Sequence, residues 1–186
     1  MTWIESVSLE QATGYLSALY EKHQRPNHSI ANIYSAHSLR PHTLEGHTAL
    51  YQAVLGHPDN VLARWFLETV GLYVSILNGC AYCIDHHAYA GRLAYPGESS
   101  GWSSIVRALM EDSIEDVFDG KRLVFLAYVR TLTLDAAGLT AKSIDMLREA
   151  GASDGEILEV NQVVGYFSYA NRVALGLGVT LDGEIP

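Results

Sequence analysis

The stretch LNGCAYCIDHHAYAGR, residues 77–92, decides the architecture that we expect for this chain. Asn78-Gly79 is a helix-stop signal, because both residue types tolerate the left-handed backbone conformation that ends helices. A new helix is expected to begin at or near Cys80 and to end before Pro96. The pattern therefore predicts two consecutive helices joined by a sharp corner.

The helix before this corner is predicted to begin after a cap at Asp59 or Asn60 and to run to about Leu77. It is expected to be buried, because it is apolar on nearly every face. Between Trp65 and Ile84 the only charged residue is Glu68. The charge-free part of this window is shorter than the roughly 20 apolar residues that a membrane span needs. We therefore expect burial in protein, with no membrane partner.

The rest of the chain also shows helical periodicity, and no segment alternates with the period of a strand. No long linker or fixed repeat divides it, so we expect one all-α domain over residues 1–186 with its motif core at about 60–93. The other expected helices run from the Ser8–Gln11 capping box to before Pro26, around Ile30 to His37, from Pro41 to Leu55, near Trp102 to Met110, from Lys121 to Leu134, from Thr140 to Gly151 and from the Ser153–Glu156 capping box through Leu175, with a loop over residues 94–101.

The composition narrows the class of function. Among 186 residues, 12 Lys and Arg oppose 21 Asp and Glu, which gives a net charge of −9. An acidic surface repels phosphate backbones, so a nucleic-acid partner is not expected. The N-terminal sequence MTWIESVSLEQ carries two glutamates and lacks a secretion signal, which favours a cytoplasmic location.

Two cysteines, Cys80 and Cys83, form a Cys-x-x-Cys pair at the start of a predicted helix. Unpaired backbone N–H groups and the helix dipole lower the pKa of a thiol at this position. Cys83 falls within the first turn and is expected to benefit from those donors. Cys80 is expected to lie nearer the solvent, and a disulfide between the two would need little backbone movement.

Two further residues complete a candidate proton relay. His87 follows Cys83 by four residues, which places both on one face of a helix. Glu68 is a lone charge on an apolar helix, and a buried carboxylate is costly unless it has a partner or a function. If the corner after Leu77 folds the helices together, Glu68 can reach His87 and orient its imidazole.

Glu68, Cys80, Cys83 and His87, at these spacings, resemble the alkyl hydroperoxidase D-like (AhpD-like, carboxymuconolactone decarboxylase-like) family. The chain is most similar to the uncharacterised peroxidase-related branch of that family. The resemblance extends upstream through IANIYSAHSLRP and downstream to YFSYANRVALGLGV. One departure concerns Tyr82, because the best-characterised branch has a histidine between the cysteines.

The resemblance implies an all-helical bundle, with the Cys-x-x-Cys pair at the N-terminus of a central helix, that associates as a homotrimer or homohexamer. It implies an antioxidant oxidoreductase, a thiol peroxidase in which Cys83 attacks the peroxide and Cys80 resolves it, with Glu68 and His87 relaying protons and Tyr82 as an accessory candidate. A small hydroperoxide and an external dithiol or thiol protein would be its partners. No cofactor or metal is required.

Four alternatives stay open at this stage. The pair could bind zinc together with His86 or His87 and a further ligand such as Glu68, although a second Cys-x-x-Cys or HxxxH pair is absent. The thiols could be buried and inert, or they could serve as a redox sensor without turnover. A decarboxylase-like or lactone-cleaving enzyme is the fourth alternative, and by the resemblance those branches lack the Cys-x-x-Cys pair.

The remaining candidate residues receive structural interpretations. Glu68 could pair with Arg64 or Arg172. His86 is expected at a surface or interface, because His87 has the better spacing. The other residues with structural or surface interpretations are His23, His28, His37, His42, His47 and His57, at surfaces or interfaces, Tyr166, Phe167 and Tyr169, in the core or a subunit interface, and Asn171 and Arg172, joining helices or subunits.

Overall fold

The structure is a computed structural model that describes residues 2–184, and all regular elements in this range are helical. The all-α prediction is confirmed. The helices are α1 (Gly14–His23), α2 (Asn32–Ala36), α3 (Pro41–Tyr51), α4 (Arg64–Leu77), α5 (Ala81–Ala94), α6 (Ser99–Glu111), α7 (Gly120–Leu134), α8 (Ala141–Glu149) and α9 (Asp154–Leu177), with a π-helical turn η1 (Gln52–Gly56) and short 3-10 turns η2 (Ile114–Asp116) and η3 (Ala136–Gly138).

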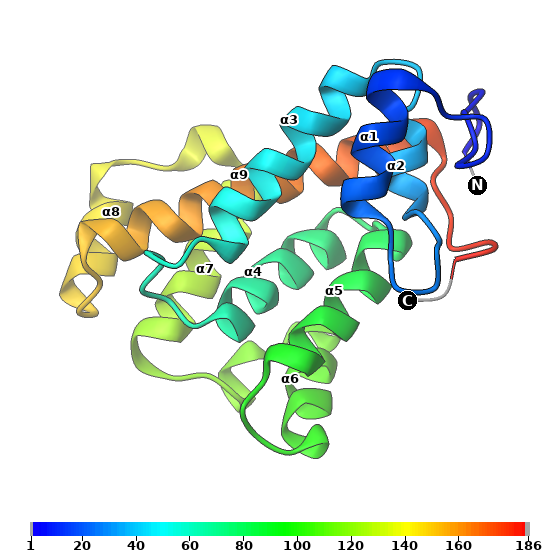
Figure 1. The fold of residues 1–186 in the computed structure, drawn as a ribbon. Helices are drawn as coiled ribbons and strands as arrows, with labels where there is room; N and C mark the ends of the chain where they lie inside the picture. The colour runs from blue at the N-terminus through cyan, green and yellow to red at the C-terminus, as the bar shows by residue number, and fades with distance from the viewer. Residues whose placement is uncertain (1, 185–186) are drawn as a thin grey trace.

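Helices α4 and α5 form a hairpin at the centre of the fold, and the long helix α9 packs against α4 (Figure 1). The apolar composition of α4 explains its position, because its residues 66–75 are all buried. Burial of one large apolar side chain contributes roughly 1.5–3 kcal/mol, so this helix is a main source of the fold's stability. The predicted central buried helix is confirmed.

The corner between α4 and α5 forms as the Asn78-Gly79 pair predicts. Asn78 is the C-cap residue of α4, and Gly79 has φ +69°, which an L side chain rarely adopts. The N–H of Cys80 then donates to the carbonyl of Ser75 at 2.9 Å, which closes the turn. Cys80 becomes the N-cap of α5, so the Cys-x-x-Cys pair sits at the start of that helix.

Close packing joins α4 to α9 on the side of the cysteines. A Cβ atom at Gly71 would lie 2.2 Å from Cζ of Phe167, so the aromatic ring occupies the space that only glycine leaves free. Phe167 is fully buried and its ring meets the ring of His87 edge-on at 4.3 Å. The contact fixes one wall of the region around His87.

Three predicted boundaries differ from the structure. Ser8 and Gln11 make the reciprocal bonds of a capping box, yet they close a single turn and α1 begins only at Gly14. Helix α4 begins at Arg64, after a segment whose N–H groups at 61 and 62 donate to the carboxylate of Glu159. Helix α6 begins at Ser99, inside the expected 94–101 loop. The contact with Glu159 joins segments far apart in the sequence, so local patterns could not show it.

The segment after α9 stays at the same end of the fold and lies beside α2 (Figure 1). Asn32, the first residue of α2, donates through its side chain to the carbonyls of Thr180 and Asp182 at 2.7 and 3.2 Å. Near the other end of the chain, the N–H of Trp3 bonds the carbonyl of Leu177 at 2.8 Å. Among the helices of residues 2–184, none has the length and apolar character needed to cross a membrane.

Candidate active site

A cavity of about 340 Å³ lies along α5, with walls from α1, α2, α3 and α9. Cys83 and His87, both on α5, reach this cavity together. Most of the remaining lining is aromatic, and it includes His47 and Tyr51 near the end of α3 and Tyr166 of α9. The arrangement places a thiol and a proton carrier in an aromatic-walled pocket of the size that binds small organic molecules.

Both cysteines are free thiols and both are buried, Cys80 with 1% and Cys83 with 4% of its surface exposed. The expectation that Cys80 lies nearer the solvent is wrong. The corner at Gly79 turns the chain inward, so the N-cap side chain points toward the interior. Cys83 lines the cavity and is therefore the sulfur that faces an incoming small molecule.

The two thiols share a hydrogen bond, and their ionisation is unequal. The side chain and the backbone N–H of Cys83 both donate to the sulfur of Cys80, which lowers the pKa of Cys80. Contact with that sulfur, together with burial, raises the pKa of Cys83. The lowered pKa expected at Cys83 is therefore found at Cys80, because the side chain of Cys83 is the donor of the pair and the sulfur of Cys80 is the acceptor.

Glu68 and His87 meet as the sequence predicted. Oε2 of Glu68 lies 2.8 Å from Nδ1 of His87, and Oε1 accepts a hydrogen bond from Nε of Arg64 at 2.8 Å. Arg64 also donates to the hydroxyl of Tyr51 at 2.9 Å. Of the two arginines considered as partners of Glu68, Arg64 is the one that pairs with it, whereas Arg172 donates to the carbonyl of Ser168.

The surroundings of Glu68 keep its carboxylate ionised. Burial would raise its pKa, but the hydrogen bond and charge of His87 and the charge of Arg64 outweigh burial and lower it. An ionised carboxylate can only accept hydrogen bonds, so the neutral imidazole carries its proton on Nδ1. Nε2 of His87 is left as the nitrogen that can take or give a proton.

Two histidines that were expected at the surface are buried. His47 has 3% and His37 has 8% of its surface exposed, and their rings lie 5.1 Å apart. Burial and the neighbouring histidines lower the pKa of His47 to about 3, so its imidazole is neutral at neutral pH. Tyr166 bonds Nε2 of His47 at 3.2 Å. His37, His47 and Tyr166 come together only when the helices pack, so the sequence did not show this contact.

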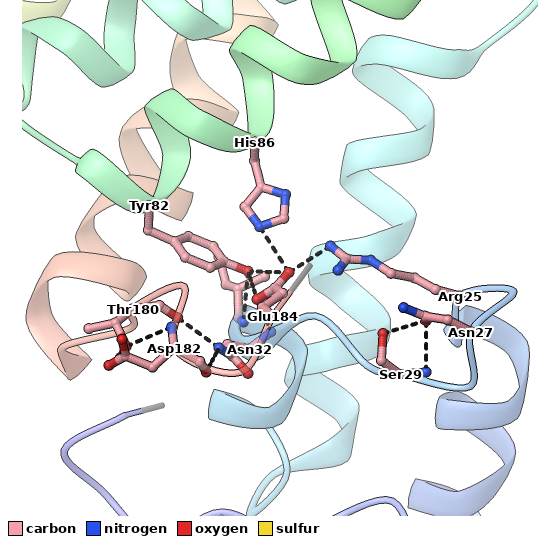
Figure 2. Close-up of polar contacts among 10 residues, drawn as sticks. Arg25, Asn27, Ser29, Asn32, Tyr82, His86, Thr180, Asp182 and Glu184 are labelled. Atoms are coloured by element: carbon pink, nitrogen blue, oxygen red, sulfur yellow. Dashed lines mark hydrogen bonds and ion pairs between the residues drawn. The ribbon is translucent and has the colours of Figure 1, made fainter. Parts of the chain in front are cut away.

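A second buried carboxylate, Glu184, contacts two residues that line the cavity, and no pattern in the sequence indicated it (Figure 2). Its Oε2 accepts from the hydroxyl of Tyr82 at 3.1 Å, and its Oε1 lies 2.9 Å from Nε2 of His86. His86 lines the cavity, and its side chain is 19% exposed. The hydroxyl of Tyr82 also accepts the N–H of Ile33, which ties the accessory candidate to α2.

Asn171 contacts Cys83 from α9. Its side chain hydrogen-bonds the sulfur of Cys83, which lowers the pKa of that thiol. Its amide also donates to Ser75 at 3.2 Å and accepts from Asn78 at 2.9 Å. Asn171 therefore joins helices as predicted, and in addition it touches the sulfur that faces the cavity.

Within residues 2–184 no cluster of three or more His, Cys, Asp or Glu side chains is arranged to hold a metal ion. Glu68, which was considered as one possible zinc ligand, bonds Arg64 and His87.

No protein-family model and no curated protein matches the chain. Solved structures do match it. An uncharacterised peroxidase-related protein from Ralstonia eutropha JMP134, described as an alkylhydroperoxidase AhpD core, aligns with TM-score 0.83 and 16% identity over 100% of this chain and 97% of its own. A protein from Agrobacterium tumefaciens, of unknown function and named as a candidate antioxidant defence protein AhpD, gives TM-score 0.66 and 26% identity over 77% and 93%. The debrominase Bmp8 gives TM-score 0.70 and 15% identity over 89% and 84%.

These structures share the helical architecture of the chain over most of their length. The chain therefore has the AhpD-like all-helical fold, and the resemblance drawn from Glu68, Cys80, Cys83 and His87 is confirmed.

Proposed function

We propose that the chain is a thiol-dependent hydroperoxide reductase that works through a disulfide between Cys80 and Cys83. One observation carries the proposal: Cys83 and His87 line the same aromatic-walled cavity, and Cys80 is hydrogen-bonded to Cys83 from behind. The site joins a nucleophile, a proton carrier and a second thiol. The AhpD-like and antioxidant names of the structural neighbours support the same class of reaction.

In the first step, Nε2 of His87 takes the proton of Cys83, whose sulfur then attacks the terminal oxygen of the hydroperoxide. The O–O bond breaks, and its electron pair leaves with the alkoxide. His87 gives the proton to the alkoxide, which departs as an alcohol, and Cys83 is left as a sulfenic acid. Glu68 holds the imidazole in position and stabilises its charged form.

In the second step, Cys80 attacks the sulfur of Cys83 and the sulfenic oxygen leaves as water. The lowered pKa of Cys80 suits this role, because a thiolate is the attacking species. An external dithiol then reduces the disulfide by exchange and restores both thiols. The proposal also includes a small hydroperoxide as the substrate, an external dithiol as the reductant, and a trimeric or hexameric assembly. Light scattering on the purified protein measures the assembly.

The test is a thiol count before and after one equivalent of cumene hydroperoxide. The unaltered protein should lose two thiols and release one equivalent of cumyl alcohol, and turnover should continue when dithiothreitol is supplied. Cys80→Ser should stop at a trapped sulfenic acid on Cys83, and Cys83→Ser should lose peroxide consumption. Full peroxide consumption by Cys83→Ser would overturn the proposal, and a single oxidation without turnover would favour the redox sensor.

A second candidate reaction is the reductive removal of a halogen from a small aromatic ring. The aromatic lining of the cavity favours it, together with the structural likeness to a debrominase that was solved with 2,3,4-tribromopyrrole. Two thiols would supply the two electrons, so that carbon–bromine becomes carbon–hydrogen while a disulfide and bromide form. Bromide release from 2,3,4-tribromopyrrole, measured beside peroxide consumption, decides between the two reactions.

A further inference from the structure

Two neighbouring histidines on α5 each face a carboxylate of their own. Nδ1 of His87 lies 2.8 Å from Glu68, and Nε2 of His86 lies 2.9 Å from Glu184. Both carboxylates have fully buried side chains. They come from opposite parts of the sequence, one from α4 and one from the segment after α9. The function proposed above uses only the first pair.

The carboxylate of the second pair is held by three further partners. Glu184 accepts from Nη2 of Arg25 at 2.6 Å and from the N–H of Asn32 at 2.8 Å, and Tyr82 adds a bond at 3.1 Å. Burial would raise the pKa of Glu184, but His86, the N–H of Asn32 and the charge of Arg25 lower it. Glu184 is therefore a fixed negative charge beside the imidazole of His86.

This charge determines how His86 can act. An ionised carboxylate can only accept hydrogen bonds, so the ring nitrogen that faces it, Nε2, is the one that carries a proton. Nδ1 is then the nitrogen that can gain or lose a proton. The rings of His86 and Tyr82 lie 4.5 Å apart, and both line the cavity that Cys83 faces. Figure 2 shows His86 and Tyr82 reaching from α5 to Glu184, with Arg25 on the other side.

The proposed reaction has two departures of oxygen, and each requires a proton. The alkoxide leaves first, when Cys83 attacks the hydroperoxide, and His87 supplies its proton. The second oxygen leaves when Cys80 attacks the sulfenic acid. A hydroxide ion is a poor leaving group unless it is protonated as it departs.

We infer that His86, positioned by Glu184, supplies the proton for this second departure. The inference rests on the proposed function. The sulfur of Cys80 attacks the sulfur of Cys83, the S–O bond breaks with its electron pair on oxygen, and the proton held on His86 completes a water molecule. Cys80 enters the step as a thiolate, and the proton that it lacks is the one that His86 carries, so charges and atoms balance.

The test separates the two steps in time. The reduced full-length protein is mixed with one equivalent of cumene hydroperoxide and quenched at intervals, and dimedone adduct and disulfide are counted by mass spectrometry. In Glu184→Gln and in His86→Asn, the sulfenic acid should form at the unaltered rate, while disulfide formation slows at least tenfold and the sulfenic acid accumulates. His87→Asn should instead slow the formation of the sulfenic acid.

Two controls separate the role of Glu184 from the anchoring of its segment and from the loss of a carboxylate elsewhere. Thr180→Val removes the hydroxyl that bonds Asp182 and loosens this segment without touching the carboxylate. Glu159→Gln neutralises a carboxylate that holds the start of α4, away from the cavity. Both should form the disulfide at the unaltered rate.

The outcomes distinguish the inference from the proposed function. If the unaltered protein forms neither sulfenic acid nor disulfide, the peroxidase function fails and the inference fails with it. If the unaltered protein completes the cycle but Glu184→Gln and His86→Asn condense at its rate, only the inference is overturned. It is also overturned if Thr180→Val slows condensation as much as Glu184→Gln, because anchoring of the segment would then explain the defect.

Discussion

Oε2 of Glu68 and Nδ1 of His87 lie 2.8 Å apart, which links the middle of α4 to the first half of α5. The bond fixes which ring nitrogen faces the cavity. Glu68→Gln keeps the shape of the side chain but removes its charge, so the imidazole loses its orientation and the stabilisation of its protonated form. We expect the rate of sulfenic acid formation to fall about 100-fold, as for the loss of a positioned proton carrier.

The same substitution tests stability separately. Arg64 is the other partner of Glu68 and its side chain is 35% exposed, so the solvent compensates part of the lost ion pair. Urea unfolding should show a loss of about 1 kcal/mol. A Glu68→Gln protein that unfolds at much lower urea and reacts at the unaltered rate would contradict the role given to this carboxylate.

Asn171→Leu should raise the pKa of the Cys83 thiol, because the amide that bonds its sulfur is removed. The measurement is the rate of iodoacetamide labelling at Cys83 against pH, in the Cys80→Ser background. The midpoint should move to higher pH. Asn161→Leu, which removes an amide that bonds the hydroxyl of Tyr128 elsewhere on α9, is the matched control. Equal profiles for both variants would contradict the contact with sulfur.

Gly71→Ala should destabilise the fold by about 1–3 kcal/mol, because the added methyl group overlaps the ring of Phe167. The displaced ring also touches His87, so peroxide reactivity should fall as well. Gly165→Ala is the control on α9, where the new methyl group meets open space. It should stabilise the helix by about 0.5–1 kcal/mol, so urea unfolding should separate the two variants by opposite signs.

The buried imidazole of His47 predicts sensitivity to acid. Its pKa is about 3 in the folded chain against 6.5 when unfolded, so between these values the unfolded state binds one more proton. The free energy of unfolding should therefore fall as the pH is lowered through this window, by about 1.4 kcal/mol per pH unit from this residue. Urea unfolding between pH 7 and pH 4 measures the slope, and His47→Asn should reduce it by that amount. An unchanged slope would argue against the buried neutral histidine.

Much of the fold could be predicted from the sequence, because its signals are local. The Ser153–Glu156 capping box opens α9, and Thr140 caps α8. The Asn78-Gly79 corner ends α4 and begins the helix that carries the cysteines. The contact between Glu68 and His87 followed from the same reasoning, since a hairpin of two adjacent helices leaves few alternatives.

The rest of the site depends on packing between distant segments, which periodicity does not reveal. His86 meets Glu184 across 98 positions of the chain. Asn171 reaches Cys83 only because α9 packs against α4 and α5. The lower pKa at Cys80 follows mainly from the hydrogen bond that the side chain of Cys83 donates to its sulfur, which the spacing of the two cysteines does not show.

The burial of both thiols has a kinetic consequence. Cys83 reaches the surroundings through the cavity, and Cys80 lies behind it with 1% of its surface exposed. On the proposed cycle, the oxidant and the reducing dithiol use one opening and cannot occupy it together. Turnover should follow ping-pong kinetics, with parallel double-reciprocal lines, and excess hydroperoxide should compete with the dithiol for the oxidised protein.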